Sequence, residues 1–180
     1  MKVGVILGSV RPNRMSDRVC TMLTEELERR GHNVTVFDPI EIDLPLLVDY
    51  WIGPNEEKPK NTTQELTQKT NNSLKVQEAF IICTPEYNFR FDLGSMRCRL
   101  LVQFLFSIPP ALSNFIAHFP YDSFQWKCVS IISYSMGPFG GVRCQAHLRS
   151  MCSIIGLTPL PTAIVLPVVQ TWVIPSYFII

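Results

Sequence analysis

A loop near the start of the chain brings hydroxyl and guanidinium groups together directly after a short apolar segment, residues 3–7. It contains four candidate anion ligands, Ser9, Arg11, Arg14 and Ser16. A predicted helix begins where this loop ends, and the first N–H groups of a helix have no partner within it. Hydroxyls, guanidinium groups and a helix N-terminus can together bind an anion such as phosphate. This stretch alone leaves open an ordinary strand–helix turn with solvated arginines.

Two further loops follow apolar runs and contain groups that suit a flat polar ligand. After the run at 79–83 comes a rigid proline turn with an aromatic ring and an amide, formed by Thr84, Pro85, Glu86, Tyr87 and Asn88. After the run at 128–134 comes a glycine-rich loop that contains Ser135, Gly137, Gly140 and Gly141. Glycine has no side chain, so the backbone of such a loop can approach a planar ligand closely.

Alternating strand and helix patterns would position these loops. Strands are predicted at residues 3–7, 33–38, 79–83, 128–134 and 163–166. Helices are predicted at 16–30, capped by Ser16 or Asp17, at 62–77 with an interruption at 71–73, and at 141–155; residues 39–60 read as a surface loop. This order predicts an α/β domain with a parallel five-stranded sheet.

The carboxyl ends of parallel strands meet at one edge of the sheet, and ligands bind in the crevice there. We therefore expect the three loops to lie side by side. An anion site at one end and a surface for a planar heterocycle at the other describe a mononucleotide such as FMN.

The three motifs together resemble the NAD(P)H-dependent FMN reductase family. They are Gly8-Ser9-x-Arg11-x-x-Arg14, Thr84-Pro85-Glu86-Tyr87-Asn88, and Ser135 to Gly141 with two closing glycines. The family has a flavodoxin-like fold, a three-layer sandwich, and includes quinone, azo-dye and chromate reductases. The resemblance covers most of residues 1–88 and 109–162. It implies FMN and NAD(P)H as cofactors, hydride transfer through flavin N5 to a small-molecule electron acceptor such as a quinone, and a homodimer.

The same resemblance implies a role for each motif. The FMN phosphate would be held by Ser9, Arg11, Arg14 and Ser16. The isoalloxazine ring would be lined, mostly through backbone groups, by Pro85, Glu86, Tyr87 and Asn88, and its pyrimidine edge approached by Ser135, Gly137, Gly140 and Gly141. No catalytic side chain is required, because the cofactor carries the chemistry. Glu86 is expected to stay solvated rather than act as a base, and Tyr87 could simply pack at the strand end.

Two stretches depart from the family pattern. Residues 89–108 form an atypical insertion, which could be a buried helix, a dimer contact or sequence foreign to the fold; we favour the last. Residues 169–180 form an apolar tail where relatives have a helix, so the last helix is expected to be missing. These departures leave a second hypothesis, a flavodoxin-like interaction module or inactive variant that binds FMN poorly or not at all. We assign residues 1–168 to one FMN-binding domain.

The composition of the chain bears on its partners, on metal binding and on its location. A formal charge of +1 argues against a nucleic-acid partner, which requires a concentrated basic face. The six cysteines are scattered without metal-ligand spacing, which favours a reducing, cytoplasmic location and no metal site. We expect Cys83 to be a core residue rather than a nucleophile. Residues 163–180 are uncharged and raise the question of a membrane anchor, but their prolines argue against a spanning helix.

Overall fold

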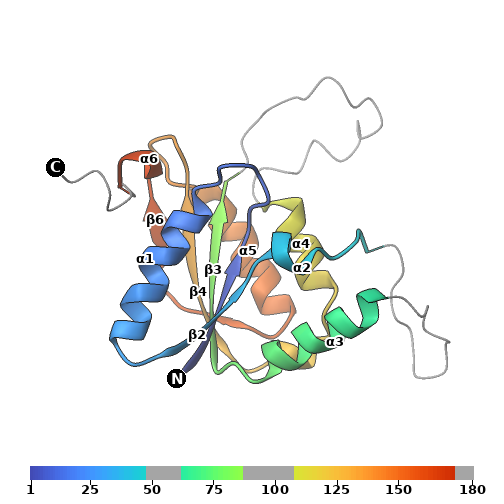
Figure 1. Cartoon of the computed structure of the whole chain (residues 1–180). Helices are drawn as coiled ribbons and strands as arrows, with labels where there is room; N and C mark the ends of the chain where they lie inside the picture. Colours follow the sequence, from blue (N-terminus) through green and yellow to red (C-terminus); the bar gives the residue numbers. More distant parts are fainter. Residues whose placement is uncertain (48–61, 87–107, 173–180) are drawn as a thin grey trace, which may run out of the picture.

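A single parallel sheet forms the centre of the computed structural model, which describes residues 1–47, 62–86 and 108–172. The strands are β1 (Lys2–Leu7), β2 (Asn33–Phe37), β3 (Ala79–Pro85), β4 (Cys128–Tyr134), β5 (Thr158–Pro159) and β6 (Ile164–Leu166). Their order is β2-β1-β3-β4-β5, and β6 also pairs with β4 (Figure 1). β5 pairs with the first residues of β4 and β6 with its last three. Two short strands, β5 and β6, therefore share the position beside β4 where one fifth strand was expected.

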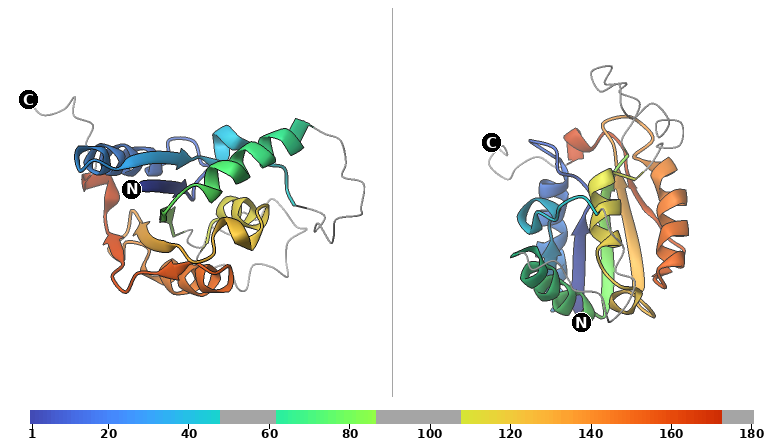
Figure 2. Two further views of the ribbon diagram at one scale, coloured as in Figure 1. Left: turned by 90° about the horizontal axis from the view of Figure 1, so that it is seen from below. Right: turned by 90° about the vertical axis from the view of Figure 1, so that its right-hand side faces the viewer.

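Helices cover both faces of this sheet. They are α1 (Ser16–Arg29), α2 (Pro39–Ile42), α3 (Thr62–Lys75), α4 (Pro110–Ala117), α5 (Val142–Ile154) and α6 (Val169–Trp172). One core cluster joins α3, α4 and α5 to the face that carries Ile6 and Ile82. A second, smaller cluster joins α1 and α6 to the face that carries Val5 and Cys83. Figure 2 shows α1 and α5 on opposite sides of the sheet. The expected three-layer α/β sandwich is confirmed.

Three local predictions were wrong. Helix α3 is not interrupted at 71–73, since Leu74 is fully buried and Asn71 accepts a hydrogen bond from the Ser123 hydroxyl. The expected loop at 39–60 begins with α2, whose N-cap Asp38 accepts a hydrogen bond from the Ile40 N–H at 2.8 Å. An acidic N-cap followed by proline is a helix-start signal that the sequence contained.

The cap of α1 also differs from the prediction. Met15 occupies the N-cap position without a side-chain hydrogen bond, and Ser16 is the first helical residue. At the other end Arg30 is the C-cap and Gly31 follows with φ +80°, as the sequence indicated.

The end of the domain is short. A single turn, α6, follows β6, and its Val169 is fully buried against the cluster that contains Val5 and Val19. Residues 87–107 and 173–180, which include most of the expected insertion and tail, lie outside the described residues. Within the described ranges, no helix has the length and apolarity that a membrane span requires.

Candidate functional site

The three loops begin side by side at one edge of the sheet, as expected from the strand order. β1 and β4 both pair with β3, so the ends of these strands at Leu7, Pro85 and Tyr134 are neighbours at the upper edge in Figure 1. The Gly8 N–H donates to the Cys83 carbonyl at 2.8 Å, and the Glu86 N–H donates to the Tyr134 carbonyl at 3.2 Å. The parallel pairing thus continues into the loops themselves.

The first loop has features that fit a phosphate. Ser9 is buried, Arg11 is exposed, and the Arg11 N–H donates to the Ser9 hydroxyl oxygen at 3.4 Å. The buried Ser16 hydroxyl has no hydrogen-bond partner in the part of the chain that the structure describes. Buried polar groups are normally paired, so a hydroxyl left unpaired at an uncapped helix start fits an anionic ligand that completes it.

Arg14 belongs to the same loop but its guanidinium is already engaged. It donates from Nε to Asp17 Oδ1 at 2.5 Å, and from Nη1 to the Ser9 carbonyl at 2.5 Å and to Asp38 Oδ1 at 2.8 Å. Nη2 donates to Asp38 Oδ2, which makes the pair with Asp38 bidentate. The Arg14 and Asp38 side chains are only 7% and 10% exposed. Sequence reasoning missed Asp38, although its place at the end of β2, next to β1, was an available signal.

The pKa values of this pair follow from their mutual contact. Burial alone would raise the pKa of Asp38, but the hydrogen bonds from Arg14 and from the Ile40 N–H outweigh it and hold the pKa below the usual aspartate value. The hydrogen bonds that Arg14 donates to the Asp38 carboxylate raise the pKa of Arg14. Both groups are therefore charged wherever the protein is folded near neutral pH.

The second loop corrects one prediction. Glu86 is not solvated: its side chain is 1% exposed, and its Oε1 lies 2.7 Å from Nη2 of Arg143. Its Oε2 accepts from the Arg143 N–H at 3.3 Å, in the first turn of α5, where a helix favours negative charge. Glu86 thus joins the second loop to the third. Pro85 is buried at the end of β3, and Tyr87 and Asn88 lie outside the described residues.

The glycines of the third loop have different surroundings. A Cβ on Gly140, where φ is +55°, would lie 2.4 Å from Cγ1 of Val165. A Cβ on Gly141, where φ is +77°, would lie 3.3 Å from Cβ of Glu86. For Gly137, the nearest atom to such a Cβ is Ser135 Oγ at 3.9 Å. Gly140 and Gly141 are required by the fold, whereas Gly137 has open space beside it.

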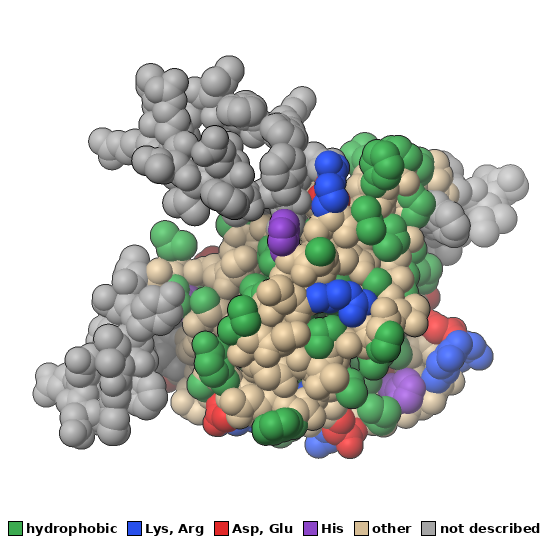
Figure 3. Space-filling model, turned by 180° about the vertical axis from the view of Figure 1, so that it is seen from behind, with side chains coloured by type: hydrophobic (Ala, Val, Ile, Leu, Met, Phe, Trp, Pro, Cys, Tyr) green, Lys and Arg blue, Asp and Glu red, His purple; other side chains and the backbone are tan. Residues whose placement is uncertain are grey.

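Large apolar side chains on this loop and at the start of α5 are exposed: Met136 by 68%, Phe139 by 66% and Val142 by 49%. Hydrophobic side chains are also scattered over the face opposite to that of Figure 1 (Figure 3). Ser135 donates from its hydroxyl to the Gly137 carbonyl at 3.0 Å, which fixes the start of the loop.

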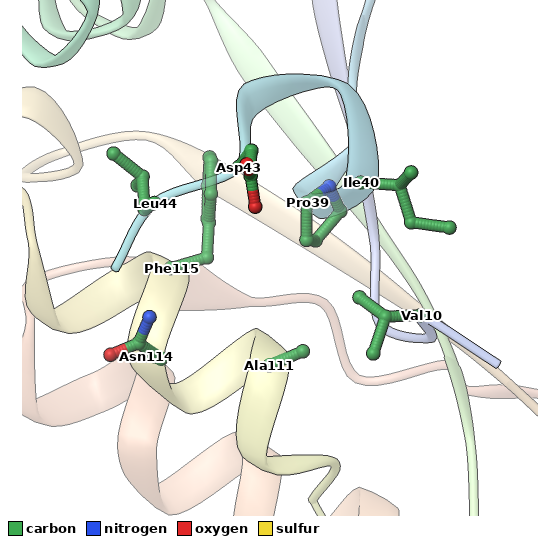
Figure 4. A pocket seen from close by; sticks show the side chains of 8 residues that line it. All are labelled: Val10, Pro39, Ile40, Asp43, Leu44, Ala111, Asn114 and Phe115. Atoms are coloured by element: carbon green, nitrogen blue, oxygen red, sulfur yellow. The ribbon is translucent and has the colours of Figure 1, made fainter. Parts of the chain in front are cut away.

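A pocket of about 330 Å³ adjoins the first loop (Figure 4). Its walls come from that loop, from α2 and the residues after it, and from α4, and its lining residues are Val10, Pro39, Ile40, Asp43, Leu44, Ala111, Asn114 and Phe115. The Asn114 amide binds the segment that follows α2. It accepts from the Leu47 N–H at 2.9 Å and donates to the Pro45 carbonyl at 3.0 Å. The pocket is mainly apolar, with the Asp43 carboxylate at its wall.

Other reactive groups in the described residues do not form a site. Burial raises the pKa of the Cys83 thiol well above its ordinary value, so Cys83 is a core residue, as expected. Among residues 1–47, 62–86 and 108–172, no group of three or more histidine, cysteine or acidic side chains is placed to hold a metal ion.

Comparison with known proteins identifies relatives of the chain. The sequence profile of the family described as NADPH-dependent FMN reductase matches residues 1–91 and 103–171. An NAD(P)H-dependent FMN reductase from Schizosaccharomyces pombe is 27% identical over 174 residues, which are 92% of this chain and 74% of that protein. A quinone reductase from Escherichia coli is 27% identical over 154 residues, 84% of this chain and 69% of that protein.

Solved structures show the same fold. The flavoenzyme NAD(P)H:(acceptor) oxidoreductase FerB from Paracoccus denitrificans superposes with a TM-score of 0.64 at 23% identity, over 90% of this chain and 77% of its own. A flavodoxin mutant from Pseudomonas aeruginosa superposes with a TM-score of 0.50 at 16% identity, over 94% and 86%. The flavodoxin-like fold is thereby confirmed.

The family profile covers most of the chain and all of the described loops. It confirms the resemblance seen in the three motifs, and with it an oxidoreductase class that uses FMN and NAD(P)H. The chain belongs to the NADPH-dependent FMN reductase family.

Proposed function

We propose that this chain is an NAD(P)H-dependent reductase that holds FMN across the three loops and reduces quinones or similar small acceptors. The observation that carries the proposal is the buried Ser16 hydroxyl, which has no partner in the described residues and lies at the uncapped start of α1. It leaves a donor and a helix N-terminus for an anionic group, next to two loops suited to a ring. Relatives named as FMN and quinone reductases support the choice of cofactor and acceptor.

The phosphate would be bound by Ser9, Arg11 and Ser16. Arg11 supplies the charge, since it is exposed and its backbone is held by Ser9. Charge-assisted hydrogen bonds from a guanidinium to a phosphate are about twice as strong as neutral ones. The ring would lie against the backbone at Pro85 and Glu86 and beside the third loop. Tyr87 and Asn88 remain predictions from the family motif.

When bound, FMN would accept hydride from NAD(P)H at N5 and pass the reducing equivalents to the acceptor. The protein would contribute position and polarity. Glu86 holds the second loop to the start of α5 through Arg143, so the two ring-facing loops keep a fixed spacing. Backbone N–H groups of the third loop near Gly137 would stabilise negative charge at the pyrimidine edge of the ring.

For the whole protein, we propose a homodimer, a division into domain, insertion and tail, and a cytoplasmic location. Exposed apolar side chains next to the ring site, such as Phe139 and Met136, support a homodimer with the site near its interface. Residues 1–168 would form the cofactor-binding domain, with 89–108 as an insertion and 169–180 as an apolar tail, in a cytoplasmic enzyme.

The phosphate assignment is tested by titrating the purified chain with FMN and with riboflavin, which lacks the phosphate. Arg11→Ala should weaken FMN binding about 10- to 150-fold, the loss of one charge-assisted contact of about 1.5–3 kcal/mol, and leave riboflavin binding unchanged. Arg29→Ala is the matched control, because Arg29 is an exposed arginine at the far end of α1, the helix that follows the first loop. Equal FMN affinity in Arg11→Ala and in the parent protein would remove the assignment.

A further inference from the structure

The Arg14 guanidinium uses four of its five N–H groups on the protein itself. Two bind the Asp38 carboxylate, one binds Asp17 and one binds the Ser9 carbonyl. The Arg14 and Asp38 side chains are almost completely buried. For Arg14 to turn toward a ligand, it would have to leave a buried carboxylate unpaired, which is strongly unfavourable.

Asp38 connects three parts of the structure. It follows the last residue of β2, it caps α2 by accepting from the Ile40 N–H at 2.8 Å, and it holds Arg14. Through Arg14 it also fixes the Ser9 carbonyl, at the point where the first loop leaves β1. The loop segment that contains Arg11 is therefore anchored at both ends, by Ser9 and by Arg14.

The charges of this cluster also argue against direct contact with an anion. The Arg14 cation is shared by two carboxylates, Asp17 and Asp38, so the group as a whole carries a net negative charge. A phosphate placed on Arg14 would meet those carboxylates at close range. The same arrangement does suit a brace that holds the loop in shape.

We propose that Arg14 and Asp38 are a positioning pair that fixes the first loop in the shape that binds the FMN phosphate, and that Arg14 does not itself contact the phosphate. This inference rests on the proposed function. It assigns to Asp38, a residue outside the three motifs, a part in cofactor binding, and it changes the role of Arg14 from ligand to brace.

The substitution Asp38→Asn gives opposite results for a brace and for a ligand. Asp38→Asn keeps the N-cap acceptor for Ile40 and removes the charge partner of Arg14. A positioning pair predicts weaker FMN binding, on the order of tenfold for one lost phosphate contact. A phosphate-contacting Arg14, released from its carboxylate, would instead bind FMN more tightly. Titrations at physiological ionic strength limit the long-range effect of the changed charge.

Arg14→Lys tests the pair from the other side. Lysine keeps the charge but cannot bind Asp38 bidentately while also reaching the Ser9 carbonyl. We expect FMN binding to fall about tenfold, the loss of one charge-assisted contact, as in Asp38→Asn. The Arg14→Lys/Asp38→Asn double variant should be no weaker than either single variant, since both act through one pair. Riboflavin binding should stay within about twofold of the parent, since the ring loops are untouched.

Several results would overturn the proposal: tighter FMN binding by Asp38→Asn, unchanged binding by Arg14→Lys, additive losses in the double variant, or an equal loss of riboflavin binding. Glu26→Gln is the control, because it removes the exposed ion pairs with Arg29 and Arg30 at the far end of α1 and should leave FMN binding unchanged. If Asp38→Asn does not fold, Arg14→Lys keeps the proposal testable, because unchanged FMN binding in that variant would overturn it. Failure of the phosphate site itself is seen separately, as an Arg11→Ala variant with parental FMN affinity.

Discussion

At the scale of single residues, two buried serine hydroxyls near the site differ in whether they have hydrogen-bond partners. Ser133 and Ser16 are both fully buried serines near the sheet edge. The Ser133 hydroxyl accepts from Gln145 Nε2 at 2.8 Å and donates to the Gly140 carbonyl at 2.9 Å. Ser16 has no such partner within the described residues. Removing each hydroxyl should therefore have a different effect on the stability of the protein.

Ser16→Ala should leave the stability of the cofactor-free protein unchanged or raise it by up to about 1 kcal/mol, because no hydrogen bond is lost. It should weaken FMN binding. Ser133→Ala should lower the free energy of unfolding by about 1–3 kcal/mol, since the Gly140 carbonyl and the Gln145 amide lose a partner. Urea unfolding without cofactor, and FMN titration, measure both effects. A Ser16→Ala variant as unstable as Ser133→Ala would show that Ser16 has a structural role.

His118 gives the fold a pH dependence. The residue is half-buried after α4, and its Nε2 lies 2.8 Å from the Pro45 carbonyl oxygen. Burial lowers its pKa below the usual value of 6.5, so the unfolded chain binds the proton more readily. The contribution of His118 to stability should be complete above pH 6.5 and decrease as the pH falls from there through the lowered pKa. Urea midpoints at pH 7 and at mildly acid pH test this, and His118→Gln should flatten the dependence. A steeper dependence in His118→Gln would contradict it.

The residue types of the site were predictable, but their partners were not. The sequence placed Ser9, Arg11 and Ser16 in one loop because they are neighbours in the chain. The pairing of Arg14 with Asp38 depends on β2 lying beside β1, and the burial of Glu86 depends on α5 starting beside β3. Such contacts join distant segments, so local pattern does not reveal them.

At the scale of elements, the strand ends and the loops that follow them carry the site. The limits of β1, β3 and β4 were predicted closely, because continuous apolar runs mark strands buried on both faces. The short β5 was not predicted. Helices α2 and α3 were predicted less well. Contacts from Ser123 and from buried Leu74 keep α3 unbroken through Asn71, which is a poor helix former.

The third loop allows a test of which glycines serve the fold. Gly140→Ala should lower the free energy of unfolding by about 1–3 kcal/mol, because its φ is +55° and the new Cβ would collide with Val165. Gly137→Ala is the matched variant, with nothing closer than 3.9 Å to the new Cβ. It should retain parental stability and weaken flavin binding if the open side of Gly137 faces the ring. Equal destabilisation of both variants in urea would contradict this division.

At the scale of the whole molecule, the order of elements was the most predictable feature. Strand–helix–strand units imply right-handed crossovers and parallel pairing, and these bring the three loops to one edge. The coverage of the second sheet face was less predictable. Only α1 and the single turn α6 pack there in the described part of the chain, and Val36 of β2 stays 40% exposed.

The most direct measurement is an anaerobic titration of the purified chain with FMN, followed by NADPH, monitored through the visible absorption of the flavin. We expect saturable binding of one FMN per chain and loss of that absorption on addition of NADPH. A chain that stays colourless after reconstitution with FMN, and that does not respond to NADPH, would contradict the central claim. It would favour an interaction module or inactive variant with the same fold.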